Sequence, residues 1–206
     1  MTPYPSIPKR HRIGLLVPSS NITIETELPA LLRRQEVRTH HRFSIHSQRL
    51  ALRDVTLESL WAMNRSAEDG AELLSHAAVD AIVYGCLIAA LSEGPGAHRT
   101  IEEKLKQRVQ RNGKATPIIS SAGALIDTLQ SGGFQKVGVL APYHPALTEK
   151  LTRYFAEEGI NVHASRSLNI TDNLKVGMID PLSLLDELRH LPDSLDALVL
   201  LSLIHI

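Results

Sequence analysis

The most informative shortage in this 206-residue sequence is cysteine, which occurs once, at position 86. One cysteine cannot form an internal disulfide, which excludes a fold that depends on such a cross-link and fits a reducing compartment. The first eleven residues are polar and proline-containing, so they lack the apolar core of a signal peptide. We interpret residues 1–11 as a loose N-terminal arm, and we expect a cytoplasmic protein.

Excess charge and long apolar runs are also absent. The 22 basic and 22 acidic residues give a formal net charge of zero, whereas nucleic-acid-binding domains usually carry a basic excess. No apolar run approaches the length of a membrane span. We therefore expect neither a nucleic-acid partner nor a membrane partner.

Known metal and dinucleotide motifs are missing as well. The ten histidines contain no H-E-x-x-H or similar pair, and the adjacent His40 and His41 would point to opposite faces of a strand. Gly94-Pro95-Gly96 lacks the third glycine and the preceding strand of a dinucleotide-binding fingerprint. The sequence thus predicts no metal site.

Short apolar segments alternate with helical ones along the chain, which predicts parallel βαβ units. Strands are expected at residues 12–18, 37–46, 79–86, 117–119, 136–142, 162–168 and 195–200. Helices are expected at residues 23–34, 56–78, 100–109, 120–129, 145–158 and 182–191.

The second half of the chain repeats the first. Residues 136–142 match residues 12–18 almost residue for residue in type, and residues 195–200 copy residues 79–84. We therefore expect an α/β protein of two pseudo-symmetric, Rossmann-like lobes. Each lobe would contain a parallel sheet, and a ligand cleft would lie between them.

The lobes are expected at residues 12–120 and 121–206, and the second one looks incomplete. After Leu200 the sequence continues only to Ile206, and no helix follows to cover the last strand. We expect a C-terminally truncated chain that lacks the last elements of its second lobe and shows no turnover. The closing hexapeptide also resembles a cloning or assembly scar.

Cys86 follows directly on the apolar segment that begins at Val79. In open α/β sheets, ligands bind just beyond the carboxyl ends of the strands, so this position suits a nucleophile. A small buried thiol that only fills space is the alternative, because free cysteine is among the most buried residue types. Position alone leaves the two interpretations open.

Five motifs, in this order and spacing, resemble the maleate cis-trans isomerase group of the aspartate/glutamate racemase superfamily. They are Pro18-Ser19-Ser20-Asn21, Tyr84-Gly85-Cys86-Leu87, Ser121-Ala122-Gly123-Ala124, Pro142-Tyr143 and the stretch from Ser167 through Asp172-Asn173. The resemblance covers nearly the whole chain.

The resemblance implies cofactor-independent isomerisation of maleate, or a close cis-enediacid, with Cys86 as the nucleophile. The thiolate adds to the alkene, the new single bond rotates, and elimination gives the trans product. Backbone amides and helix N-termini would lower the pKa of the thiol. A second cysteine would follow the last strand at about residues 203–204, where this sequence has none.

The resemblance also implies that Asn21, Tyr143 and Asn173 hold the carboxylates of a small dicarboxylate substrate, and that the protein is a homo-oligomer. Each residue has a simpler interpretation. Asn21 could cap the following helix, Asn173 could be a turn residue, and Tyr143 could be an exposed loop aromatic. Ser120 and Ser121 are expected to cap a helix.

Two other functions stay open at this point. The same fold could support a racemase or a decarboxylase that acts on another small carboxylate. A non-catalytic domain that binds a small acid is the alternative from a different class.

Overall fold

Two fully parallel sheets divide the protein. The computed structural model describes residues 9–113 and 115–201. The first sheet has the order β2-β1-β3-β4 and the second the order β6-β5-β7. The strands are β1 (Arg10–Pro18), β2 (Arg42–Leu50), β3 (Ala81–Tyr84), β4 (Ile118–Ser120), β5 (Val137–Ala141), β6 (Val162–Ser167) and β7 (Ala197–Leu200). The predicted α/β class with parallel sheets is confirmed.

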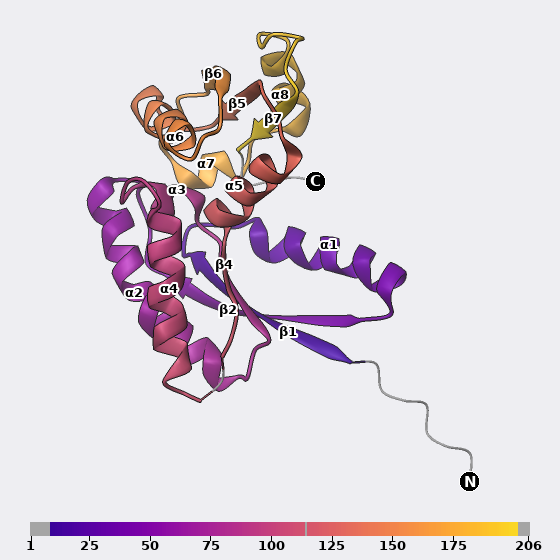
Figure 1. The fold of residues 1–206 in the computed structure, drawn as a ribbon, viewed down its shortest axis with the longest axis vertical. Helices are drawn as coiled ribbons and strands as arrows, with labels where there is room; N and C mark the ends of the chain where they lie inside the picture. The colour runs from indigo at the N-terminus through magenta and orange to yellow at the C-terminus, as the bar shows by residue number, and fades with distance from the viewer. Residues whose placement is uncertain (1–8, 114, 202–206) are drawn as a thin grey trace.

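Helices cover both faces of the first sheet: α2 and α4 lie on one side of it and α1 lies on the other (Figure 1). The helices are α1 (Ile24–Thr39), α2 (Leu57–His76), α3 (Leu87–Leu91), α4 (Ala97–Gln110), α5 (Ser121–Gly132), α6 (Pro145–Glu157), α7 (Asn173–Val176) and α8 (Pro181–Leu188). Among the described residues, no helix combines the length and apolarity that a membrane crossing requires.

The predicted strand at residues 37–46 is wrong at its start. Helix α1 continues to Thr39, and β2 begins only at Arg42. The β-branched Val37 lies in the last turn of this helix, where its side chain is 81% exposed. The helix ends because His40 adopts a left-handed backbone (φ 56°) while its N–H donates to the Glu36 carbonyl oxygen.

The sequence repeat corresponds to a repeated backbone clamp. In the first sheet, the Asp80 N–H donates to the Arg12 carbonyl oxygen (2.7 Å), and Asp80 Oδ2 accepts from the Arg12 N–H (2.9 Å). In the second, the Asp196 N–H donates to the Lys136 carbonyl oxygen, and Asp196 Oδ2 accepts from the Lys136 N–H, both at 2.9 Å. Each aspartate thus ties the start of one strand to the start of its neighbour.

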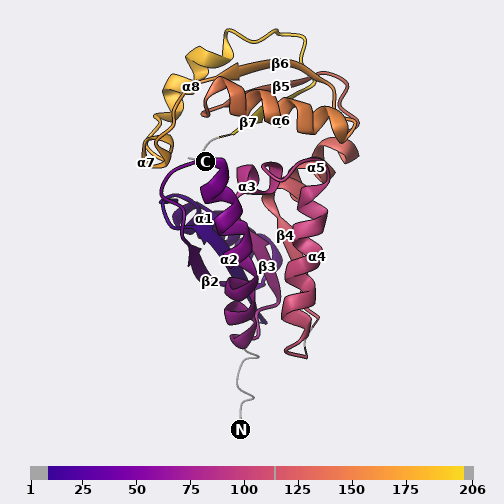
Figure 2. The same cartoon turned by 90° about the vertical axis from the view of Figure 1, so that its left-hand side faces the viewer.

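One buried core runs through both halves. Leu16, Tyr84 and Cys86 of the first half and Val139 and Tyr154 of the second belong to a single hydrophobic cluster. Helices α3 and α5 lie between the two sheets (Figure 2). The boundary proposed between the lobes at residue 120 stays a prediction.

Candidate active site around Cys86

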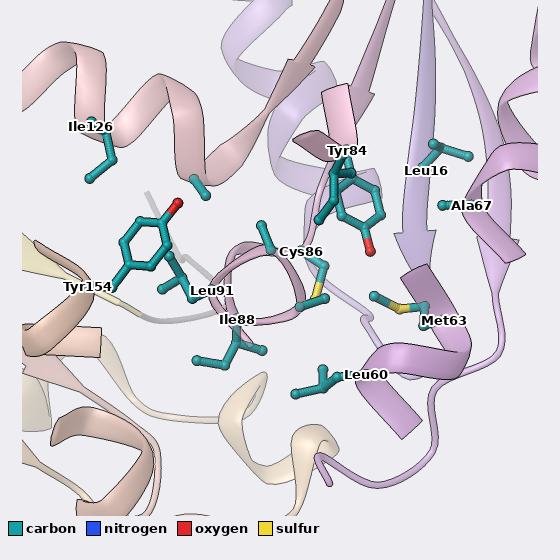
Figure 3. Close-up of a cluster of buried hydrophobic side chains, with 14 of the residues drawn as sticks. Leu16, Leu60, Met63, Ala67, Tyr84, Cys86, Ile88, Leu91, Ile126 and Tyr154 are labelled. Carbon is teal, nitrogen blue, oxygen red and sulfur yellow. The ribbon is translucent and has the colours of Figure 1, made fainter. Parts of the chain in front are cut away.

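Cys86 lies between the last residue of β3 and the first residue of α3. Its backbone is extended (φ −140°, ψ 96°) and it occupies the N-cap position of α3. The side chain is 7% exposed. Figure 3 shows it among Tyr84, Met63 and Ile88, which belong to the same buried cluster. The only thiol of the sequence is therefore enclosed by apolar side chains.

Burial raises the pKa of Cys86 to about 12, although the backbone N–H groups of Ala89 and Ile88 act in the opposite direction. The expected lowering of this pKa is therefore wrong for the ligand-free protein. The helix N-terminus contributes as predicted, but desolvation of the sulfur outweighs it. At neutral pH the Cys86 thiol is therefore protonated and uncharged.

Helix α3 is a feature that sequence reasoning missed. Its five residues, Leu87–Leu91, follow Cys86 directly, and four of them are buried. The run Leu-Ile-Ala-Ala-Leu consists mostly of good helix formers, and this was the signal that could have revealed it.

Asn21 is 2% exposed and closes the turn between β1 and α1. Its side-chain oxygen Oδ1 accepts from the N–H groups of Thr23 (2.9 Å) and Ile24 (3.1 Å). Asn21 is not the N-cap residue of α1, which is Thr23, but its side chain satisfies the N–H of Ile24, the first residue of the helix. These two donors also fix the amide orientation, and Nδ2 has no hydrogen-bond acceptor among the described residues.

An arginine that the sequence reasoning did not consider anchors this turn. Arg49 Nη2 donates to the carbonyl oxygens of Ser19 and Asn21, both at 2.8 Å. Arg49 also forms an ion pair with Glu25 of α1. The loop that carries Asn21 is thereby tied to the end of β2.

Neighbouring contacts bring the Asn21 turn to the Cys86 segment. A Cβ atom added at Gly85 would lie 2.9 Å from Ile24 Cδ1, so the start of α1 packs directly against the residue before Cys86. A Cβ atom added at Gly177 would lie 3.0 Å from Ile22 Cγ1. The residue that follows α7 thus packs on the same turn from the second half.

Tyr143 follows β5 and packs, half-buried, against the cluster that contains Cys86. Burial raises the pKa of its phenol, and a charge on Cys86 raises it further. The phenol therefore stays protonated at neutral pH and is a hydrogen-bond donor. The Tyr143 carbonyl oxygen accepts from the Ser167 hydroxyl and from the Asn169 N–H (3.2 Å), which ties the loop after β5 to the end of β6.

Asn173 is the first residue of α7 rather than part of a loop. Its side chain lies outside the described part of the structure. The Asp172 carboxylate accepts from the Leu174 N–H (3.0 Å) at the start of this helix. Residues 203–204, where the second cysteine was expected, also lie outside the described residues.

Ser120 caps α5 as predicted. Its hydroxyl oxygen accepts from the Gly123 N–H (2.9 Å). Glu102 Oε1, which sequence reasoning did not single out, accepts from the Ser120 N–H (2.8 Å) and from its hydroxyl (2.5 Å). Ser121 Oγ is buried and has no hydrogen-bond partner within residues 9–113 and 115–201.

Two cavities, of about 450 and 370 Å³, lie away from Cys86. Glu102 and Lys106 of α4 contribute to the first, and Glu149 and Arg153 of α6 to the second. Neither is lined by a predicted site residue. No group of three or more potential metal ligands occurs within residues 9–113 and 115–201.

The family model described as arylmalonate decarboxylase matches residues 13–201. Maleate isomerase from Alcaligenes faecalis is 41% identical over 194 residues, which cover 93% of this chain and 77% of that protein. Maleate isomerase from Geobacillus stearothermophilus is 43% identical with the same coverage. The chain belongs to the family of maleate isomerases and arylmalonate decarboxylase. The resemblance to maleate isomerases noted from the sequence motifs is confirmed.

Solved structures of this family agree with the fold described above. A cysteine-to-alanine variant of the maleate isomerase Iso from Pseudomonas putida S16, with maleate, has a TM-score of 0.92 at 43% identity and covers 95% of this chain and 79% of that one. A cysteine-to-serine variant of the Nocardia farcinica enzyme, with a covalently bound succinylcysteine intermediate, has a TM-score of 0.89 at 37% identity, with 94% and 79% covered. An arylmalonate decarboxylase structure at 22% identity and TM-score 0.74 shares the fold.

Proposed function

We propose that this protein isomerises maleate to fumarate through a covalent adduct on Cys86. The observation that carries the proposal is the position of the only cysteine of the sequence, at the carboxyl end of β3 and in a buried cluster against which Tyr143 packs. The succinylcysteine intermediate of the Nocardia farcinica relative supports the same chemistry here.

The reaction balances without a cofactor. The Sγ–H bond of Cys86 breaks, a bond forms between Sγ and one alkene carbon, and the proton ends on the neighbouring carbon as the π bond is lost. The product is a succinyl group on Cys86, whose central carbon–carbon bond is single and can rotate. Reversal of the same steps from the rotated form breaks the Sγ–C bond, removes the proton and gives fumarate.

The raised pKa of Cys86 fits an addition in which deprotonation accompanies attack. A permanently charged thiolate would repel a substrate dianion, whereas a neutral thiol lets the dianion enter. Desolvation then makes the sulfur, once deprotonated, a reactive nucleophile. Cys86 therefore loses its proton only as the electron pair of the sulfur forms the bond to the alkene carbon.

Neutral hydrogen-bond donors would hold the two carboxylates. Asn21 Nδ2 has no acceptor among the described residues and is free to donate to a carboxylate. The Tyr143 hydroxyl stays protonated and offers a second donor. We assign Asn173, at the start of α7, the remaining carboxylate contact. Such donors stabilise the charge that grows on the carboxylate as sulfur adds.

The number of cysteines leads to a specific expectation for this chain. The relative with the succinylcysteine intermediate carries serine in place of one cysteine, and the present sequence has a single cysteine. We expect the succinyl adduct to form on Cys86, since the Cys86 thiol itself supplies the proton that the neighbouring carbon gains.

Mass spectrometry of the whole 206-residue protein tests the proposal. After incubation with maleate, the protein should gain the mass of one maleic acid, with the modification on Cys86 in a peptide digest. Succinate is the matched control ligand, because it has both carboxylates but no alkene. The Cys86→Ala variant should gain no mass. Failure of the wild-type protein to gain mass, or gain of the same mass by the variant, would contradict the proposal.

The decarboxylase alternative has weaker support. The maleate isomerase structures reach 37–43% identity and TM-scores of 0.89–0.92, whereas the arylmalonate decarboxylase structure at 22% identity carries the fold alone. The small-acid-binding alternative predicts reversible binding of maleate without mass gain. The cytoplasmic location and the homo-oligomeric state stay predictions, which fractionation of cells and light scattering would test.

A further inference from the structure

Asn64, on α2, is hydrogen-bonded to both chain segments that flank Cys86. Its Nδ2 donates to the Ala89 carbonyl oxygen (2.9 Å) and to Glu93 Oε1 (2.7 Å). Its Oδ1 accepts from the Tyr84 hydroxyl. Asn64 is 8% exposed and Tyr84 is fully buried, so water does not compete freely for these bonds.

The chemistry of its partners fixes the orientation of this amide. A carbonyl and a carboxylate only accept hydrogen bonds, so the nitrogen of Asn64 must face Ala89 and Glu93. The oxygen must then face Tyr84, whose hydroxyl donates. The amide nitrogen and oxygen of Asn64 are both paired, and a buried polar network makes a structure rigid when its members are paired.

The segment after Cys86 needs such an anchor. Helix α3 has five residues, and isolated helices that short do not form stably in water. Helix α2 is 20 residues long and packs its buried side against the first sheet. Figure 3 shows Tyr84 near Cys86. Asn64 thus connects a rigid helix to a short one.

Ala89 links this network to the sulfur. Its carbonyl oxygen is held by Asn64, and it lies in α3, the short helix whose N-cap residue is Cys86. A shift of Ala89 would therefore move the helical turn that begins at Cys86. Small misplacements of reacting groups can cost about 10²-fold in rate.

We propose that Asn64 is a positioning residue for the Cys86 nucleophile, holding Tyr84 and Ala89 so that the turn between them presents the sulfur in one geometry. The inference rests on the proposed function, in which that sulfur adds to maleate. Asn64 does not touch the substrate in this account.

The Asn64→Leu variant tests the proposal, because leucine has nearly the same size but neither donates nor accepts. Two rates are measured on the whole protein at several pH values: alkylation of Cys86 by iodoacetamide and succinyl adduct formation from maleate. Loosening α3 admits water to the sulfur, so alkylation at pH 8 should rise at least about tenfold. Adduct formation should fall by about 10–10²-fold, because the geometry for addition is lost. Tyr84→Phe, which keeps the bond from Asn64 to Ala89, should change both rates in the same directions but less.

Leu74→Ala is the matched control, because Leu74 is also buried on α2 but packs near Gly14, on β1. It should lower stability without changing either rate more than about twofold. The proposal is overturned if Asn64→Leu leaves both rates at the wild-type values, or if Leu74→Ala reproduces its effects. If Asn64→Leu does not fold, Tyr84→Phe decides by the same criteria. If wild-type protein forms no adduct, the proposed function fails, whereas the alkylation profile still decides whether Asn64 positions the thiol.

Discussion

The two halves of the molecule carry the same strand motif in different surroundings. Strands β3 and β7 each follow an aspartate that clamps the neighbouring strand. In β3, Ile82 and Tyr84 are fully buried, whereas in β7 Leu198 is 42% and Leu200 39% exposed. Leu198 and Leu200 lie on the same face of β7, and that face is exposed, whereas Val199 on the opposite face is only 5% exposed. A shared local sequence thus sets the backbone, and the neighbouring elements set the environment.

The only cysteine of the sequence, Cys86, is buried in the first half. The Gly85 N–H donates to the Leu16 carbonyl oxygen, and the Leu201 N–H donates to the Leu140 carbonyl oxygen in the same way, both at 2.8 Å. Up to this residue the two strand ends match. Beyond it, Cys86 enters a desolvated cluster, and this environment controls its reactivity.

The largest expected effect is the difference in alkylation rate between a thiol at the end of β3 and a thiol on β7. At pH 8, a thiol with a pKa of about 12 has about 10³-fold less thiolate than one at the ordinary value of 9.0. Iodoacetamide should therefore label ligand-free Cys86 about 10³-fold more slowly than a small free thiol. Because the pKa is raised, the rate should climb about tenfold per pH unit above pH 8.

The control for this prediction places the thiol on the exposed edge. Leu200→Cys in the Cys86→Ala background puts a thiol at a position that is 39% exposed, and it should react almost like a free thiol. Equal labelling rates at the two positions would show that burial does not control Cys86.

A smaller effect on stability is expected when the side chains at the equivalent positions Ile82 and Leu198 are shortened. Ile82→Ala should lower the free energy of unfolding by about 2–5 kcal/mol, since Ile82 is fully buried. Leu198→Ala, at the edge, should cost less than about 1 kcal/mol. Guanidinium unfolding of both variants measures the difference. Comparable losses would mean that the edge of the second sheet is covered in solution.

Each half is expected to contribute one donor to substrate binding, Asn21 from the first and Tyr143 from the second. Losing a hydrogen bond to a carboxylate costs about 1.5–3 kcal/mol, so Asn21→Ala and Tyr143→Phe should each slow adduct formation about 10–10²-fold. Stopped reactions analysed by mass spectrometry give these rates.

Asn21→Asp separates the two roles of Asn21. Aspartate keeps an oxygen for the Thr23 and Ile24 N–H groups, so these hydrogen bonds and the stability should be retained. It also replaces the free donor with a charge that repels a carboxylate, so adduct formation should fall as in Asn21→Ala. If Asn21→Asp formed the adduct at the wild-type rate, Asn21 would only stabilise the start of α1 and would not bind substrate.

The smallest difference is expected at the two equivalent strand glycines. A Cβ atom at Gly138 would lie 2.4 Å from Leu195 Cδ1, whereas one at Gly14 would meet Ile82, Leu74 and Val79 at 3.1–3.3 Å. Gly138→Ala should cost about 1–3 kcal/mol through overpacking, and Gly14→Ala less. Thermal unfolding of the pair checks the order, and the reverse order would mean that Leu195 moves aside easily.

The sequence was sufficient to predict the strands, their parallel pairing and the repeat, because apolar runs and the aspartates that precede them are local signals. It misplaced the start of β2, because Val37 favours strands by type but lies on an exposed turn of α1. The direction of the Cys86 pKa shift was also missed. That shift depends on burial by side chains such as Met63, which reach the thiol only through the tertiary fold.

A crystal structure of the protein soaked with maleate would test the nucleophilic role of Cys86 most directly. This role predicts continuous electron density from Cys86 Sγ to a succinyl carbon, with carboxylate oxygens within hydrogen-bond distance of Asn21 Nδ2 and the Tyr143 hydroxyl. Maleate bound elsewhere, with Cys86 unmodified, would contradict it.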